Sequence, residues 1–261
     1  PMQAYQAGTF AKLRKKRGDQ PMSTNLVQLI GHNAIRNGVV GPLARPAWED
    51  EIKISQFLLA QAIEQGVWGM SLGLGYVPGL FADKAELATL MEMCYIDDVI
   101  VTVHMRDECE HVFEALEEMI ELAKATKVRL HISHLKLGDK SVWGKAEQLY
   151  NRIHQAKAEG ARITMDVYPY NACSTGLSSR LPAWALDGGA EKATKLLKTP
   201  GIAKGNILEN DKLKVTVNGN VFIPAKDILR LNPLGDKAAI HVFIINDRGM
   251  TYTADLKLSN L

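Results

Sequence analysis

The sequence has no long apolar run. No stretch approaches the ~20 apolar residues that a helix needs to cross a bilayer, and the basic stretch near the N-terminus runs into polar sequence instead of the apolar core of a signal peptide. We therefore expect a cytoplasmic protein with no membrane partner.

Cysteine is scarce, and neither sign of charge is in excess. The three cysteines, Cys94, Cys109 and Cys173, show no CxxC spacing, which fits reduced thiols in a cytosolic protein better than a disulfide framework or a structural zinc finger. With 31 basic and 29 acidic residues, the net charge of +2 gives no electrostatic reason to bind nucleic acid. The one basic cluster, at 12–17, is interpreted as a solvated helix face. A small molecule is the expected partner.

From about residue 26 to residue 170, short β-rich runs alternate with longer segments of helical period. This alternation is typical of βα units around a parallel sheet. The expected strands are 26–31, 67–72, 99–104, 128–133 and 162–167, and the expected helices are 49–65, 83–94, 109–126 and 143–158. The third of these helices has an apolar stripe at three- and four-residue spacing, formed by Val112, Leu116, Met119, Ile120 and Ala123.

Polar residues at the ends of successive strands favour a barrel over an open sheet. His104 and Arg106, His134 and Lys136, and then Asp166 all lie at or just beyond such ends. Barrel enzymes carry their chemistry at this rim, whereas an open doubly wound sheet would concentrate such residues at one switch point. The predicted fold class is therefore α/β, of the (β/α)8 TIM-barrel type, incomplete here with about five βα units.

The character of the sequence changes beyond about residue 190. Residues 199–201 and 218–219 are turn signals, "KVTVNGNVFI" predicts a hairpin, and "AAIHVFIIND" predicts another strand. We therefore divide the chain into a partial barrel domain at 1–192 and a β-rich C-terminal segment at 193–261.

His104 and His134 are the strongest candidates for chemistry. Thirty residues, the length of about one βα repeat, separate them, so they are expected at equivalent ends of neighbouring strands, where their side chains could converge. Neutral imidazoles at a barrel mouth suit an open catalytic zinc site, although either residue could instead be a satisfied packing histidine. His131 should face the opposite side of the strand from His134 and is given a structural role. His32 is a further candidate for the rim.

Two cations and a glycine-rich segment belong to the same expected rim. Lys136 and Arg106 lie two residues beyond their histidines and could bind a carboxylate, or could be solvated loop cations. The segment "GMSLGLGYVPG", residues 69–79, has neither the GxGxxG pattern nor a Walker lysine. We interpret it as a tight turn that presents Tyr76 rather than as a phosphate-binding loop.

Five segments together resemble a known family. They are "GHNAIR" (31–36), "GMSLGLGYVPG" (69–79), "HMRDE" (104–108), "ISHLK" (132–136) and "DVYPYNACSTGL" (166–177). In this order and spacing, and over about residues 20–190, the chain resembles the N-acyl-D-amino-acid deacylases (D-aminoacylases) of the metal-dependent amidohydrolase superfamily.

The resemblance implies a zinc-dependent barrel that hydrolyses the amide bond of an N-acyl-D-amino acid to a carboxylate and a free D-amino acid. By motif, His104 and His134 correspond to two metal ligands, and Lys136 and Tyr76 correspond to groups that hold the carboxylate of the substrate. We add Arg106 as a further substrate-binding cation of the rim.

The sequence also departs from the family. The family's His-x-His pair and metal-binding cysteine do not precede "GHNAIR", and the Gly-Ser-Asp-Gly-type segment with the general base is not found, so no catalytic residue is assigned. Five strands cannot close an eight-stranded barrel without exposed edges, which could pair with a second copy of the chain. The alternatives are a catalytically inactive truncated barrel that acts as a binding or subunit-interaction protein, and an amidohydrolase for cyclic amides.

Overall fold

The structure is a computed structural model that describes residues 15, 18, 23–170, 175 and 181–198 and five later strands. The chain divides into two compact units, Pro1–Tyr168 and Pro169–Leu261. Cys173, most of the basic cluster and the turn signals at 199–201 and 218–219 lie outside the described residues. No helix in the described part of the chain has the length and apolar character needed to cross a membrane.

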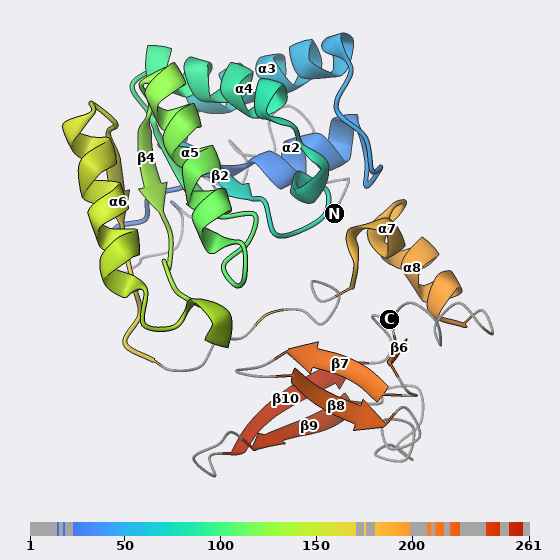
Figure 1. The fold of residues 1–261 in the computed structure, drawn as a ribbon. Helices are drawn as coiled ribbons and strands as arrows, with labels where there is room; N and C mark the ends of the chain where they lie inside the picture. The colour runs from blue at the N-terminus through green and yellow to red at the C-terminus, as the bar shows by residue number, and fades with distance from the viewer. Residues whose placement is uncertain are drawn as a thin grey trace. The chain divides into compact units, whose positions relative to one another are not determined.

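The first unit is built around a five-stranded parallel sheet (Figure 1). Its strands are β1 (Ile30–Gly31), β2 (Gly69–Gly73), β3 (Ile100–His104), β4 (Arg129–Ile132) and β5 (Ile163–Met165). Each strand pairs in parallel with the next one along the chain, in the order β1-β2-β3-β4-β5. This unbroken order is that of a barrel wall, because a doubly wound sheet reverses its strand order at a switch point. The five predicted parallel strands are confirmed, although β1 is much shorter than expected.

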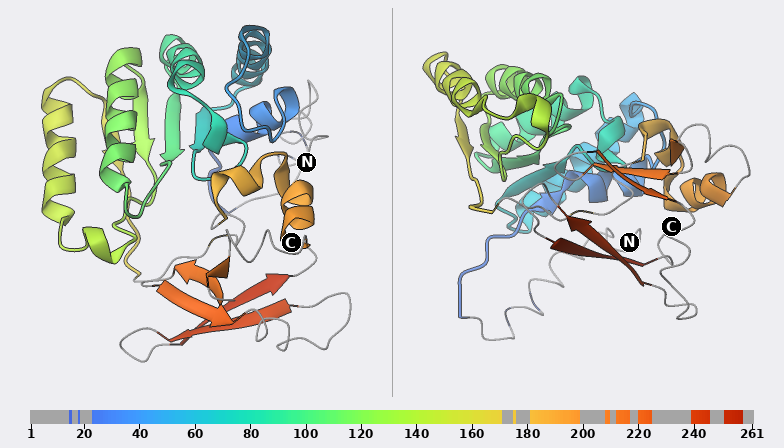
Figure 2. Two further views of the ribbon diagram at one scale, coloured as in Figure 1. Left: turned by 45° about the vertical axis from the view of Figure 1, so that its right-hand side comes forward. Right: turned by 60° about the horizontal axis from the view of Figure 1, so that its bottom comes forward.

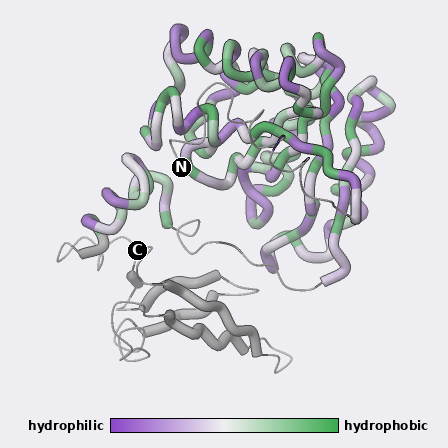
Figure 3. Tube along the Cα trace, turned by 180° about the vertical axis from the view of Figure 1, so that it is seen from behind, coloured by the Kyte–Doolittle hydropathy of each residue, from purple (hydrophilic) through white to green (hydrophobic). Residues whose placement is uncertain are grey.

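Helices follow the strands and lie beside one another in chain order (Figure 2, left). They are α2 (His32–Val39), α3 (Glu49–Glu64), α4 (Lys84–Ile96), α5 (Val112–Thr126) and α6 (Ala146–Ala158), with the short 3-10 helices η2 (Gly79–Phe81) and η3 (Lys140–Val142). Hydrophilic and hydrophobic residues alternate along these helices, as expected of amphipathic helices on one sheet (Figure 3). The structure adds α2, which the sequence reading did not include.

The two faces of the sheet have different chemistry. Val101 and Val103 of β3 are fully buried in the core that α3–α6 share with the strands, whereas Thr102 and His104 are only partly buried. This period of two follows from the pleat of a strand, which sends successive side chains to opposite faces. The face opposite the core therefore holds the polar strand residues.

The second unit contains α7 (Ala183–Leu186), α8 (Gly189–Lys198) and two small antiparallel sheets. One sheet is β6-β7-β8 (Leu208–Glu209, Lys212–Thr216, Asn220–Pro224), and the other pairs β9 (Ala239–Ile245) with β10 (Thr251–Lys257). The predicted domain boundary at 192–193 stays a prediction. The two compact units of the structure meet earlier in the sequence, between Tyr168 and Pro169.

Candidate metal centre

His104 ends β3 at the carboxyl edge of the sheet, with 22% of its side chain exposed. Its ring packs against the ring of Tyr76, with centroids 4.7 Å apart. Glycine at position 75 permits this approach, because a Cβ atom there would lie only 2.9 Å from His104 Nε2. The loop that follows β2 thus fixes one side of the imidazole.

His134 lies just beyond β4, where the chain leaves the extended conformation. Its φ of 43° is left-handed, a region that histidine enters more readily than most residues, and its backbone N–H donates to Asp166 Oδ1 at 2.6 Å. This turn places His134 Nε2 3.1 Å from His104 Nδ1, with the two rings edge to face. The two histidines that the sequence reading expected to converge are in contact.

Glu108 is the third member of this cluster, and the sequence reading missed it. Its Oε1 atom lies 3.6 Å from His104 Nδ1 and 2.9 Å from His134 Nδ1, and its side chain is 12% exposed. The carboxylate of Asp107 accepts from the backbone N–H groups of Cys109 and His111, which fixes the loop that carries Glu108. The three side chains form a group that could hold a metal ion, with one ligand atom from each within 4.8 Å of the others. The available signal was the position of Glu108 at the end of "HMRDE".

Lys136 contacts two members of the same cluster. Its Nζ donates to Glu108 Oε2 and lies 3.0 Å from His134 Nδ1. It also lies 5.6 Å from the centroid of the Tyr168 ring, within the range of a cation–π contact. One ammonium group is therefore held next to His134 and the carboxylate of Glu108.

Arg106 does not point its donors into the cluster. Its guanidinium forms a two-pronged ion pair with Glu118 of α5, at 2.9 and 2.8 Å, and donates to the backbone carbonyls of Leu80 at 2.7 Å and Ala82 at 3.1 Å. These contacts tie the end of β3 to α5 and to the loop around η2. Its predicted role in substrate binding stays a prediction.

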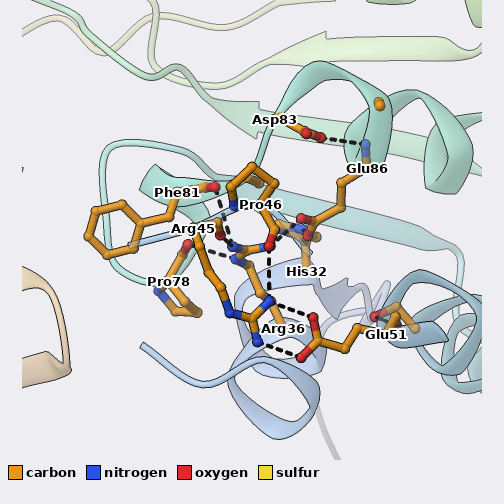
Figure 4. A network of polar contacts seen from close by, with 12 residues as sticks. His32, Arg36, Arg45, Pro46, Glu51, Pro78, Phe81, Asp83 and Glu86 are labelled. Carbon is orange, nitrogen blue, oxygen red and sulfur yellow. Dashed lines mark hydrogen bonds and ion pairs between the residues drawn. The ribbon is translucent and has the colours of Figure 1, made fainter. Parts of the chain in front are cut away.

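A buried polar network contacts the segment that follows Tyr76, at the carbonyls of Pro78 and Phe81 (Figure 4). Arg36 donates to the carbonyl of Pro78 at 3.0 Å and pairs with Glu86, while His32 Nε2 lies 2.9 Å from Glu86 Oε1. Burial raises the pKa of Glu86, but the His32 contact and the Arg36 charge outweigh it, so the net shift is downward. His32 was one candidate for the open rim, but its side chain is fully buried at the start of α2 and belongs to this network.

His131 and Asp166 form a second polar group beside the cluster. His131 pairs in register with Thr102, which shares a sheet face with His104, so the expectation that His131 and His134 face opposite sides does not hold. The reason is the turn at His134, which breaks the strand alternation. His131 Nε2 lies 2.7 Å from Asp166 Oδ2, and this contact, with the His134 N–H, lowers the pKa of Asp166.

Comparison with known proteins identifies relatives for about two thirds of the chain. No family model matches it. An N-acyl-D-glutamate deacylase of Alcaligenes xylosoxydans xylosoxydans is 32% identical over 176 residues, which are 67% of this chain and 35% of that protein. The chain therefore spans about a third of the length of the curated relatives that it matches.

Solved structures of a D-aminoacylase and of an N-acyl-D-glutamate deacylase are also similar to almost two thirds of the chain. The crystal structure of a D-aminoacylase, described as defining a novel subset of amidohydrolases, matches 63% of this chain with a TM-score of 0.60 and 30% identity, over 34% of its own length. An N-acyl-D-glutamate deacylase from Bordetella bronchiseptica, solved with zinc and a phosphonate mimic of the tetrahedral intermediate, matches 64% with a TM-score of 0.59 and 31% identity, again over 34% of its length.

Proposed function

Two thirds of this chain are homologous to the N-acyl-D-amino-acid deacylases of the amidohydrolase family, and from this premise we propose that it forms the metal-binding part of an enzyme that hydrolyses N-acyl-D-amino acids. The observation that supports this proposal best is the contact of His104 Nδ1 with His134 Nε2 at 3.1 Å, at the carboxyl ends of adjacent parallel strands. Barrel enzymes assemble their active sites at this edge.

The donor set fits zinc. Two imidazoles are common ligands of catalytic zinc, which keeps one coordination position open. Donor atoms about 2.0–2.1 Å from a tetrahedral zinc ion lie roughly 3.3 Å from each other, close to the 3.1 Å between the two imidazole nitrogens. His104 and His134 would hold the ion. When bound, zinc supplies polarisation of the scissile carbonyl and acidification of a water molecule.

Lys136 and Tyr76 are the proposed binding groups for the substrate carboxylate. The ammonium group of Lys136 contacts His134 and the ring of Tyr76 packs on His104, so both groups would border a substrate amide bound at the metal. The ammonium group of Lys136, a point charge, would hold the carboxylate end of the substrate while the acyl end faces the metal. We do not extend the proposal to Arg106, whose donors serve Glu118 and two backbone carbonyls; it positions the η2 loop.

Five strands are a part of the proposed eight-stranded barrel. Within the described residues, no strand pairs with the outer edge of β1 or of β5. Further strands, from a second copy or from chain beyond this sequence, would have to close the barrel and supply the general base. The unpaired outer edges of β1 and β5 also support a second candidate function, that of an inactive partial barrel that binds another subunit through these edges.

Release of D-amino acid decides between these two functions. The zinc-loaded chain is incubated with N-acetyl-D-glutamate, N-acetyl-D-aspartate and N-acetyl-D-leucine, and free D-amino acid is measured with a D-amino-acid-specific assay. If a second copy supplies the further strands and the general base, the deacylase proposal predicts turnover that disappears in His104→Ala and His134→Ala and persists in His154→Ala, whose exposed histidine on α6 is remote in sequence from the cluster. No turnover of any substrate would exclude catalysis by copies of the zinc-loaded chain alone and would favour the subunit-interaction candidate.

A further inference from the structure

Glu108 carries a buried oxygen atom without a hydrogen-bond donor. Its Oε2 atom accepts from Lys136, but Oε1 is shielded from solvent and no donor is aligned with it, although His134 Nδ1 lies 2.9 Å away. A buried carboxylate oxygen without a partner is costly, and in native proteins such an atom needs an explanation. A bound cation is the simplest one, because a carboxylate is acceptor-only.

This oxygen belongs to the same cluster as the two histidines, with one possible ligand atom of each residue within 4.8 Å of the others. Oε1 lies 3.6 Å from His104 Nδ1, close to the roughly 3.3 Å expected between two ligands of a tetrahedral zinc ion. The other edge of the site, from His104 Nδ1 to His134 Nε2, is 3.1 Å. Two imidazoles with one glutamate are also an established donor set for catalytic zinc in hydrolases.

Two other roles could explain why Glu108 lies here. It could be only the ion-pair partner of Lys136, or it could accept a hydrogen bond from His134 and orient that ring as an outer-sphere group. The first role uses Oε2 and leaves Oε1 unexplained. The second requires an N–H directed at Oε1, and the 2.9 Å contact lacks that alignment. Direct ligation through Oε1 is compatible with both the Lys136 contact and the burial.

We propose that Glu108 is the third protein ligand of the metal ion, binding through Oε1 while Oε2 keeps Lys136 in place. This inference rests on the proposed function, which assigns the metal to His104 and His134, and adds a ligand from the loop between β3 and α5. As a ligand, the glutamate would supply a negative donor beside the two neutral imidazoles. It also links the metal to the group proposed to bind the substrate carboxylate.

The test compares four variants for zinc affinity and for the visible absorption of the cobalt-substituted protein. Glu108→Gln removes the charged donor at nearly constant size. Lys136→Met breaks the same ion pair but keeps the proposed ligand. Glu118→Gln is the matched control, since Glu118 is a similarly buried carboxylate that pairs with Arg106. His104→Ala tests the underlying site. Circular dichroism of each metal-free variant establishes that it is folded.

The inference predicts that Glu108→Gln weakens zinc binding more than 100-fold, beyond the roughly 10–100-fold that loss of an outer-sphere partner costs. It also predicts an altered cobalt spectrum in Glu108→Gln, zinc affinity at or above that of the parent chain in Lys136→Met, and no change in Glu118→Gln. Should Glu108→Gln fail to fold, Glu108→Asp, which keeps the charge and withdraws it by one methylene, is predicted to show the same loss.

Three results would count against it in different ways. Equal losses in Glu108→Gln and Lys136→Met, with an unchanged cobalt spectrum, would assign Glu108 to the ion pair alone. A loss below 100-fold with an unchanged spectrum would make it an outer-sphere group. Either result overturns the inference while loss of zinc in His104→Ala still supports the proposed site. Full zinc affinity in His104→Ala would overturn both.

Discussion

At the scale of single residues, the absence of a side chain at Gly75 lets the ring of His104 pack closely against the loop that follows β2. A Cβ atom on residue 75 would lie 2.9 Å from Nε2 of His104, closer than real Cβ contacts allow, so Gly75→Ala must displace the imidazole. We expect zinc affinity to fall at least about 10-fold, as for loss of an orienting group. Gly38→Ala is the control, because a Cβ atom there meets nothing within 4 Å. Equal zinc affinity of both variants, measured by chelator competition, would contradict the packing argument.

Burial suppresses the reactivity of the Cys94 thiol. Burial, with a smaller contribution from the charge of Asp97, raises the pKa of its thiol to about 12, so almost no thiolate exists near pH 8. We expect iodoacetamide to modify Cys94 in the native protein far more slowly than in urea, as followed by peptide mass spectrometry. Cys109, which is only partly buried, serves as the internal comparison. Rapid native labelling of Cys94 would show that α4 does not bury it.

At the scale of elements, the pair of Glu86 and Arg36 joins α4 to α2. Removing one partner of a buried ion pair leaves the other charge uncompensated and typically costs about 3–5 kcal/mol, so Glu86→Gln should lower the free energy of unfolding by this order. Both side chains are almost fully buried, so solvent screens the pair little. The control Glu92→Gln, on an exposed position of the same helix, should have almost no effect.

The same pair makes a pH prediction with a definite sign. Because the pKa of Glu86 is lowered in the folded state from 4.5, its contribution is fully present above about pH 4.5 and is lost as the pH falls through the folded-state value. Urea titrations between pH 3 and 7 should therefore show a flatter acid decline for Glu86→Gln than for the parent chain. Parallel declines would mean that the folded carboxyl has its ordinary pKa.

The elements also show what the sequence could and could not predict. Strong β-branched runs such as the one before His104, and the five-residue apolar stripe of α5, define their elements locally, and all five stripe residues are buried. The helix α2 was missed because two of its three buried members, His32 and Arg36, are polar, and Glu86, which pairs with both, lies 50 or more residues away. Hydrophobic periodicity carries no information about side-chain partners that far apart in the sequence.

The candidate site could likewise be predicted only where it depends on the positions of the strands. Strand-end position was enough to pair His104 with His134, because adjacent parallel strands end at one edge. Glu108 and His131 were not placed correctly, since each depends on how the chain turns after a strand: the loop at Asp107 for the first and the left-handed conformation of His134 for the second. Such turns are set by individual hydrogen bonds, local at Asp107 and long-range from His134 to Asp166, that produce no periodic sequence pattern.

At the scale of the whole molecule, the outer edges of β1 and β5 predict self-association. Neither edge has a strand partner within the described part of the chain, and unpaired edges are templates for pairing with another copy. We expect sedimentation velocity to show a concentration-dependent oligomer. A Pro substitution at Met165 of β5, whose backbone N–H faces the outer edge of the sheet, should block pairing there and is predicted to reduce it. A stable monomer at all concentrations would contradict the prediction.

The proposed metal centre depends most directly on whether this chain binds zinc at the two histidines. The deciding measurement is the metal content of the purified chain, without chelator treatment, by mass spectrometry. We predict close to one zinc ion per chain in the parent and in His154→Ala, and loss of zinc in both His104→Ala and His134→Ala. A chain without bound metal, or one that keeps its zinc in both variants, would contradict the proposed metal centre.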